Sequence, residues 1–264
     1  MKTKKILAVV MAVVMVVLCF AACGKKETAK IVVAEKASVG ENVVNSESYF
    51  DGMTKTPVDT QQKALMEVKA GTADLAVIDY IMALGSTGEG SDFADLKINE
   101  DASFSPEYYG IAFRKNTDTA AVFDKAIAEL YNEGKLQEIA TKYGLEKMLV
   151  KPSESEPTEN TIAEWETIKA KGELVIGMTL FQPMDYYNDK GELVGFEVEF
   201  AKAVGEKLGI KVKFQEISWD AKETELNAKS IDCIWNGLSI DEDRKATMQF
   251  SMPYMENKQV VVSK

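Results

Sequence analysis

The sequence predicts an α/β fold made of two similar halves, each built on a parallel sheet. Short apolar strands alternate with amphipathic helices along the 264 residues. Segments 67–79 and 225–237 share one layout, in which a helix, a tight turn and an aspartate precede an apolar strand. Hydrophobic residues make up 46% of the chain and charged residues 28%, which supports a sizeable core and excludes a disordered chain.

Periodicity places the individual elements. We expect strands at 31–34, 73–78, 108–113, 173–178, 210–217, 231–235 and 259–263, and helices at 60–69, 80–84, 119–132, 136–143, 196–208 and 222–228. A further helix opens near Ser38, a candidate N-cap with Glu41 three residues on, as in a capping box. Residues 151–161 contain two prolines and no apolar run, so they predict a linker.

Composition excludes several classes of function. The net charge of −11 argues against nucleic-acid binding, which needs a basic face. The chain has no histidine, which removes Ser-His-Asp and Cys-His catalysis and most zinc sites. Among Cys19, Cys23 and Cys233, only Cys233 lies in the body of the chain, so we expect no disulfide framework. We find no P-loop, no GxGxxG and no metal-ligand spacing, and expect neither cofactor nor metal.

The N-terminus predicts a lipoprotein signal peptide over residues 1–22. Three lysines among residues 2–5 precede an apolar run at 6–20, and Phe20-Ala-Ala-Cys23-Gly24 follows. This ending resembles a bacterial lipobox, which is cut before a cysteine that carries diacylglycerol. A transmembrane anchor is the alternative reading of the apolar run. We expect a lipid on Cys23, a tether at 23–30 and a place on the extracytoplasmic face of the cell membrane.

Strand ends provide the first candidate site residues, because ligands of open α/β sheets bind beyond the carboxyl ends of strands. These residues are Asp79 in one half, and Asn236, Gly237 and Ser239 in the other. Asp79 could accept hydrogen bonds from an ammonium group, or could instead cap the next helix.

Arginine is rare in this chain, which contains only Arg114 and Arg244. The planar guanidinium grips a carboxylate through two parallel hydrogen bonds. Arg244 follows a strand end and could bind a ligand carboxylate. It could equally be a surface residue paired with Asp241 or Glu242.

Aromatic residues and helix amides add further candidates. Phe181 and Trp219 could enclose an apolar side chain of a ligand, or could belong to the core. Free amides from Ser38 to Gly40 could attract a carboxylate, although Gly40 could simply permit a turn. We interpret Glu197 and Glu199 as a solvated helix face.

Several motifs resemble the polar amino-acid family of ABC-transporter solute-binding proteins. They are ELVIGMTLFQP (173–183), GELVGFEVEFA (191–201), NGLSIDEDR (236–244), FSMPY (250–254), AGTADLAVID (70–79) and YGIAFRK (109–115). The resemblance covers nearly all of 31–150 and 162–264. It implies a two-lobed periplasmic-binding-protein-like type II fold with a ligand cleft between the lobes.

The resemblance also implies roles for the candidate residues. Arg244 would hold the α-carboxylate of an amino acid, helped by Ser239 and by backbone donors from Ser38 to Gly40. Asp79 and the Gly237 carbonyl would accept from the α-ammonium group. Side-chain contacts would come from Phe181, Trp219 and Met178, which stands where relatives often carry an acid, and Ala37 replaces the usual glycine.

The order of segments departs from the family, in which the segment seen here at 162–264 comes first. The chain therefore resembles a circular permutation, with lobe two at 31–107 and lobe one at 108–264. Linker 151–161 would join the usual C- and N-termini, although a fragment of a tandem duplication is an alternative. We expect Ile31 and Lys264 to meet at the boundary between the lobes. One covalent crossing would survive near 107–110 and leave a softer hinge.

The implied function is the capture of a free, polar amino acid by a monomeric, non-enzymatic lipoprotein. The closed form would deliver it to an ABC permease and its ATPase. The same fold also occurs in a cyclohexadienyl-dehydratase-like enzyme, which would need a general acid aimed into the cleft. A sensory domain for amino acids is the third reading.

Overall fold

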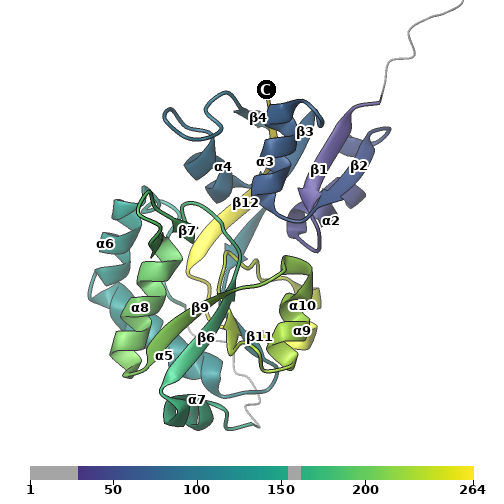
Figure 1. The fold of residues 1–264 in the computed structure, drawn as a ribbon. Coiled ribbons are helices and arrows are strands. Elements are labelled where there is room, and N and C mark those ends of the chain that lie inside the picture. The colour runs from purple at the N-terminus through teal and green to yellow at the C-terminus, as the bar shows by residue number, and fades with distance from the viewer. Residues whose placement is uncertain (1–28, 154–161) are drawn as a thin grey trace, which may run out of the picture.

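The computed structural model describes residues 29–153 and 162–264 and arranges them in two α/β bodies (Figure 1). The small body contains a five-stranded sheet with the order β2-β1-β3-β12-β4, and the large body one with the order β11-β5-β10-β6-β9. Within the described residues, every helix is too short or too polar to traverse a lipid bilayer.

The small body consists mainly of the first third of the chain, joined by the last strand. Its strands are β1 (Ile31–Glu35), β2 (Thr54–Val58), β3 (Leu75–Asp79), β4 (Lys97–Tyr109) and β12 (Met255–Ser263). Its helices are α2 (Val39–Ser46), η1 (Ser48–Phe50), α3 (Gln61–Ala70) and α4 (Tyr80–Ser86). β1 runs parallel to β2 and β3, whereas β12 runs antiparallel to β3 and β4.

The large body contains the helices that are green and teal in Figure 1. Its strands are β5 (Ala112–Arg114), β6 (Glu173–Met178), β9 (Lys211–Glu216), β10 (Cys233–Ile234) and β11 (Met248–Phe250), with a hairpin of β7 (Tyr186–Tyr187) and β8 (Leu193–Val194). Its helices are α5 (Thr119–Asn132), α6 (Lys135–Lys142), α7 (Trp165–Lys171), α8 (Phe196–Leu208), η2 (Trp219–Ala221), α9 (Lys222–Asn227) and α10 (Glu242–Thr247).

Elements with a simple apolar face match the sequence prediction. The predicted helices at 119–132 and 196–208 and the strand at 173–178 are α5, α8 and β6. In α8, Phe196, Phe200 and Val204 recur every four residues and are buried on one face. The helix ends at Gly209, whose φ of 71° lets the chain turn away.

Two topological predictions are wrong. The sheets are mixed rather than parallel, because β12 in the small body and β5 in the large body are antiparallel to their neighbours. The strand predicted at 108–113 is divided between β4 and β5, which belong to different sheets. The chain leaves one body for the other between them, at Gly110. Its amide donates to the Leu238 carbonyl over 3.0 Å.

The chain crosses between the bodies a second time, at residues 251–254 between β11 and β12. The expectation of a single surviving crossing and a softer hinge is therefore wrong. Both crossings lie beside each other, since Met255 at the start of β12 pairs with Tyr109 at the end of β4. The yellow strand β12 can be followed from the large body into the small body in Figure 1.

Ile31 and Lys264 do not lie at the position that the sequence analysis predicted. Gln259 of β12 pairs with Asp79, and Val262 pairs with Ala76, so β12 carries the chain away from the crossings. The Ile31 amide donates to Asp74 over 2.7 Å, and Lys264 Nζ lies beside Gly71. Ile31 and Lys264 thus both lie at the turn between α3 and β3, at the outer end of the sheet and not at the boundary between the bodies.

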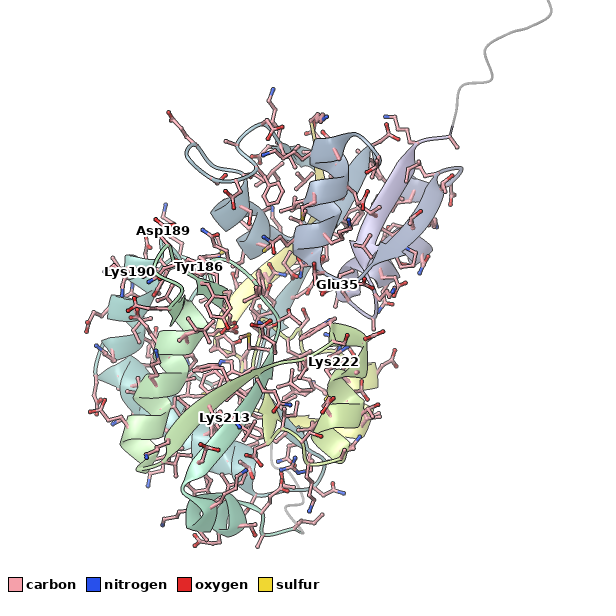
Figure 2. The ribbon with its side chains drawn as sticks, in the orientation of Figure 1. Glu35, Tyr186, Asp189, Lys190, Lys213 and Lys222 are labelled. Carbon is pink, nitrogen blue, oxygen red and sulfur yellow. The ribbon has the colours of Figure 1, made fainter. Side chains whose placement is uncertain are left out.

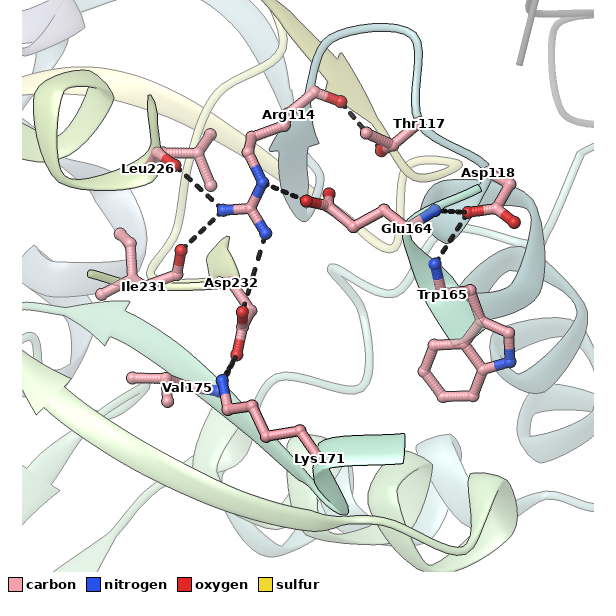
Figure 3. Close-up of polar contacts among 10 residues, drawn as sticks. All are labelled: Arg114, Thr117, Asp118, Glu164, Trp165, Lys171, Val175, Leu226, Ile231 and Asp232. Atoms are coloured by element: carbon pink, nitrogen blue, oxygen red, sulfur yellow. Dashed lines mark hydrogen bonds and ion pairs between the residues drawn. The ribbon is translucent and has the colours of Figure 1, made fainter. Parts of the chain in front are cut away.

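Arg114 is a structural residue of the large body (Figure 3). Its Nε donates to Glu164 over 2.5 Å, and its Nη1 donates to the carbonyls of Leu226 and Ile231 over 2.9 and 2.7 Å. Its Nη2 lies 3.6 Å from Asp232. The guanidinium therefore joins β5 to α9 and β10, and to the segment that follows residues 154–161.

Residues on both sides of 154–161 meet at this cluster. Asp118 accepts hydrogen bonds from the amides of Glu164 and Trp165, each over 2.9 Å. Ile162 forms a parallel bridge with Thr117. The start of the segment 162–264 is thus fixed against α5 and β5 by buried polar contacts.

Loss of the Arg114 charge should destabilise the large body strongly. We expect Arg114→Met to lower the free energy of unfolding by about 3–5 kcal/mol, because Glu164 would remain buried without its cation and Asp232 would keep only Lys171. Urea unfolding followed by circular dichroism measures this. The control is Glu138→Gln, which removes an exposed pair with Lys135 and should change the free energy by less than about 1 kcal/mol. Equal effects of the two variants would contradict the role of Arg114.

Candidate functional site

A cavity lies between the two bodies, where the carboxyl ends of β1 and β3 face those of β6 and β10. Its lining consists of Glu35, Ser38, Val39, Gln61, Asp79, Thr179, Leu180, Phe181, Trp219, Asn236, Gly237, Ser239, Arg244 and Gln259. Eight of the ten residues predicted to bind ligand are in this set, and they come from both bodies. The rule that ligands bind beyond strand ends thus located the cavity.

Asp79 ends β3 and is 6% exposed. It occupies the N-cap position of α4, but its side chain makes no capping hydrogen bond. Its carboxylate instead accepts from side chains of three other elements. The donors are Gln61 Nε2, Tyr109 Oη (2.8 Å), Asn257 Nδ2 and Gln259 Nε2 (2.9 Å). Burial raises the pKa of Asp79, and these donors oppose the rise by stabilising the carboxylate.

Glu35 ends β1 beside Asp79 and is 3% exposed. Burial, and secondly the charge of Asp79, raise the pKa of Glu35 to about 8, while Lys222 and Gln61 act in the opposite direction. The sequence analysis missed this residue. The sequence feature that could have identified Glu35 is the one that identified Asp79: an acidic residue at the end of an apolar strand.

Glu107 contributes a third acidic group at the same edge. Ser239 Oγ donates to its Oε2, so Ser239 is held by the small body although it belongs to the large one. Burial and the neighbouring charge of Asp79 raise the pKa of Glu107 to about 7. The small-body wall of the cavity thus contains the carboxyl groups of Glu35 and Asp79, with Glu107 next to them.

Arg244 supplies the facing positive charge from α10. Its Nη1 donates to the Ser239 carbonyl over 2.8 Å, and its Nη2 lies 3.4 Å from the Ala37 carbonyl in the small body. Its Nε lies 3.3 Å from Asp241, so the predicted local ion pair is also present. Arg244 is only 8% exposed, which rules out the reading as a surface arginine.

The turn that opens α2 lies opposite Arg244. Ser38 is the N-cap, and its Oγ accepts from the Glu41 amide over 3.1 Å, as expected. Glu41 reaches back to the Ala37 amide over 2.7 Å rather than to that of Ser38. The first amides of α2 therefore remain near the cavity, with Ser38 and Val39 in its lining.

Asn236 and Gly237 are held by buried acids behind the cavity. Asn236 donates to Asp185 over 2.9 Å, and the Gly237 amide donates to Glu197 over 2.9 Å. Gly237 has a φ of 54°, and a Cβ there would lie 2.3 Å from Phe181. The interpretation of Glu197 as a solvated residue is wrong, because it is 1% exposed and turns inward from α8.

Phe181 and Trp219 form the aromatic part of the lining. They are 4% and 6% exposed and belong to two separate core clusters. The Phe181 ring packs edge-on against Tyr109, with centroids 6.4 Å apart. The interpretation as core residues and the interpretation as ligand-contacting residues are therefore compatible, since each ring contacts the core and also lines the cavity.

Three predicted residues lie elsewhere. Among the described residues, the cavity lining does not include Met178 or Gly40. Met178 is 1% exposed at the end of β6, and Gly40 packs closely against Gln259 and the Val77 carbonyl. Cys23 lies outside the described residues. Residues 29–153 and 162–264 contain no group of three acidic or cysteine side chains that could hold a metal.

The cavity thus presents a guanidinium from the large body, and both amide donors and carboxylates from the small body. Such an arrangement is complementary to a small molecule that carries both a carboxylate and an ammonium group. The sequence analysis missed most of the polar side chains that complete it, namely Glu35, Gln61, Glu107, Tyr109, Thr179 and Gln259.

Comparison with known proteins gives matches to one part of the chain. L-cystine-binding protein TcyJ of Escherichia coli is 35% identical over 88 residues, which are 33% of each chain. L-cystine-binding protein TcyA of Bacillus subtilis is 36% identical over 102 residues, 38% of each chain. The chain thus spans about a third of the length of these relatives.

Among solved structures, a histidine-bound substrate-binding protein of an ABC uptake transporter from Streptococcus pneumoniae is 39% identical. That match covers 32% of this chain and 35% of the other, with a TM-score of 0.31. Residues 174–264 match the bacterial extracellular solute-binding proteins, family 3. This match lies in the part of the chain that contains the motifs at 173–183, 191–201 and 236–244.

Proposed function

We propose that this protein captures a free, polar amino acid outside the cytoplasm and delivers it to an ABC importer. The observation that carries the proposal is the pair of opposite charges in one cavity. Arg244 comes from the large body and Asp79 from the small body. An α-amino acid carries the two complementary charged groups on one carbon atom, so one ligand can bridge both bodies.

Each half of the amino acid would have several partners. Arg244, Ser239 and the first amides of α2 would bind the carboxylate, while Asp79 and the Gly237 carbonyl would accept from the ammonium group. A ligand that contacts both bodies favours the closed arrangement, because an open form offers it only half of these contacts. The two bodies would therefore act as the lobes of a type II periplasmic-binding-protein fold.

The names of the relatives support a protein that binds its ligand and does not convert it. Two are L-cystine-binding proteins, and the solved relative holds histidine. The enzyme alternative needs a general acid, and Glu35, with a pKa near 8, is a candidate that the sequence analysis did not find. The relatives' names favour capture over conversion, and we propose a binding protein that works as a monomer with a permease and its ATPase.

Substitution of either charged residue should weaken binding. We expect Arg244→Lys and Asp79→Asn each to cost about 2–5 kcal/mol of binding free energy. Lysine cannot form the two parallel hydrogen bonds of a guanidinium, and asparagine leaves the ligand ammonium group without its carboxylate. A thermal-shift panel of free amino acids selects the ligand, and calorimetry measures the affinity. Asp51→Asn is the control, since Asp51 is exposed on the small body.

The keto-acid analogue of that ligand distinguishes the two roles. Asp79→Asn should lose binding of the amino acid and retain binding of the α-keto acid, which lacks the ammonium group. Arg244→Lys should lose both. A variant that binds within about threefold of the unmodified protein, a change below ~0.7 kcal/mol, would contradict the role given to that residue.

We also propose that the protein is anchored by lipid on Cys23. The lipobox-like ending at Cys23-Gly24 behind a charged apolar segment supports this. A single acyl chain binds membranes only marginally, so a diacylglycerol group is needed for stable retention. We expect labelled palmitate to enter the unmodified protein and to be lost in Cys23→Ala. Incorporation that persists in Cys23→Ala would reject the anchor.

The order of segments supports a further proposal, that the chain is a circular permutation. The small body combines residues 31–109 with β12, so lobe one does not extend over all of 108–264 as the sequence predicted. The family match lies at 174–264, whereas the motifs that the family places later lie at 70–79 and 109–115. The new ends at Ile31 and Lys264 share one turn, so a short connection could join them. A fragment of a tandem duplication remains the alternative.

Restoring the usual order should leave the protein folded and active. The variant joins Lys264 to Ala29 by a short linker and opens the chain within 154–161. We expect its affinity to stay within about threefold of the original, because both crossings near Gly110 and Tyr254 are retained. Thermal unfolding and calorimetry measure the outcome. A variant that fails to fold, or binds more than tenfold differently, would count against the permutation.

A further inference from the structure

Lys222 is a buried cation that the proposed binding roles do not use. It begins α9 on the large body and is 4% exposed. Its Nζ lies 3.1 Å from the Trp219 carbonyl in its own body and 3.1 Å from the Ala37 carbonyl in the small body. Figure 2 shows Lys222 on the edge of the large body that faces Glu35 in the small body.

The burial of this lysine requires an explanation. Removing an ammonium group from water costs free energy unless hydrogen-bond acceptors replace the water. Burial, and secondly the charge of Arg244, lower the pKa of Lys222 to about 8. An apolar residue would cover the Trp219 ring, which lies 4.8 Å below the ammonium group, without that cost. The two carbonyl partners, the Trp219 ring and the neighbouring acidic groups compensate for this cost.

The partner of Lys222 in the small body is Ala37, which lies in the turn that leads into α2. Ala37 has a φ of 54°, in the left-handed region that favours glycine. Its carbonyl accepts from Lys222 and lies 3.4 Å from Arg244, so two cations of the large body converge on it. Ala37 directly precedes Ser38, the N-cap of α2. The orientation of this turn therefore decides where the first amides of α2 point.

We propose that Lys222 is a positioning residue of the binding site. By donating to the Ala37 carbonyl of the other body, it holds the Ala37–Ser38 turn over Arg244. The guanidinium and the first amides of α2 can then converge on one ligand carboxylate. The ligand role rests on the proposed function, whereas the contact between Lys222 and the turn does not.

The charges around Lys222 agree with this role. Arg244 repels it from the large body, and the acidic groups Glu35, Asp220 and Glu223 attract it. Of these acids, Glu35 lies in the small body, two residues before Ala37. Lys222 therefore contacts the turn at Ala37 and is attracted to the end of β1, which leads into the turn.

Amide hydrogen exchange of the ligand-free protein tests the contact. We expect Lys222→Met to speed exchange in residues 38–42 at least tenfold, because the turn loses its partner in the other body. Lys222→Arg keeps a long cationic donor and should stay within about threefold of the unmodified protein. Lys213→Met is the matched control, since Lys213 is exposed on β9 of the same body, away from the turn (Figure 2).

Calorimetry with L-histidine, L-cystine and L-arginine tests the effect on ligand. Any of them that binds should bind at least tenfold more weakly to Lys222→Met, with affinity largely restored in Lys222→Arg. If Lys222→Met does not fold, Lys222→Gln replaces it, because the shorter amide cannot span to Ala37.

Two results would overturn the proposal. One is exchange in Lys222→Met within twofold of the unmodified protein. The other is a Lys222→Arg variant that is folded and as impaired as Lys222→Met. If the unmodified protein binds no amino acid in the full panel, the proposed function fails, and the exchange comparison still decides whether Lys222 holds the turn.

Discussion

The burial of opposite charges from two bodies in one cavity is the constraint on which the rest of the structure depends. Arg244 lies on the large-body wall, and Asp79 and Glu35 lie on the small-body wall. Lys222 shares the Ala37 carbonyl with Arg244, and Glu107 accepts a hydrogen bond from Ser239. A charge that is removed from water needs a partner, so hydrogen bonds must hold the two walls of the cavity in fixed positions. Strands of both sheets end at the cavity. Polar side chains at the strand ends can therefore meet there without entering either hydrophobic core.

The sequence predicted those parts of the fold that depend on local pattern. α5 and α8 have one apolar face each, and β6 is a short apolar run that is buried on both faces, so the bounds of all three follow from local pattern. Asp79 was a candidate because it closes an apolar strand, and Arg244 because arginine is rare in this chain and Arg244 follows a strand end. The cavity contains both, and the alternative of Arg244 as a surface residue is excluded by its burial.

The rest depends on contacts between segments that are far apart in sequence. Glu197 has the spacing of a solvated residue on α8, and only the fold shows that it holds the Gly237 amide. Lys222 looks like an ordinary helix-start lysine until Ala37, 185 residues away, is placed beside it. The antiparallel pairing of β12 with β3 and β4 could not be predicted either, because the residues of a strand do not specify which strands it pairs with.

The positions of the two crossings explain how the geometry of the cavity can stay the same when the order of the segments along the chain differs. Each crossing, at Gly110 and at 251–254, lies beside the cavity and links the walls that hold the charges. The turn shared by Ile31 and Lys264 lies at the other end of the small-body sheet, with β3 spanning the distance between. A break at that turn removes no link between the walls. The cavity therefore requires the crossings and the strand ends, and is insensitive to which segment the chain encodes first.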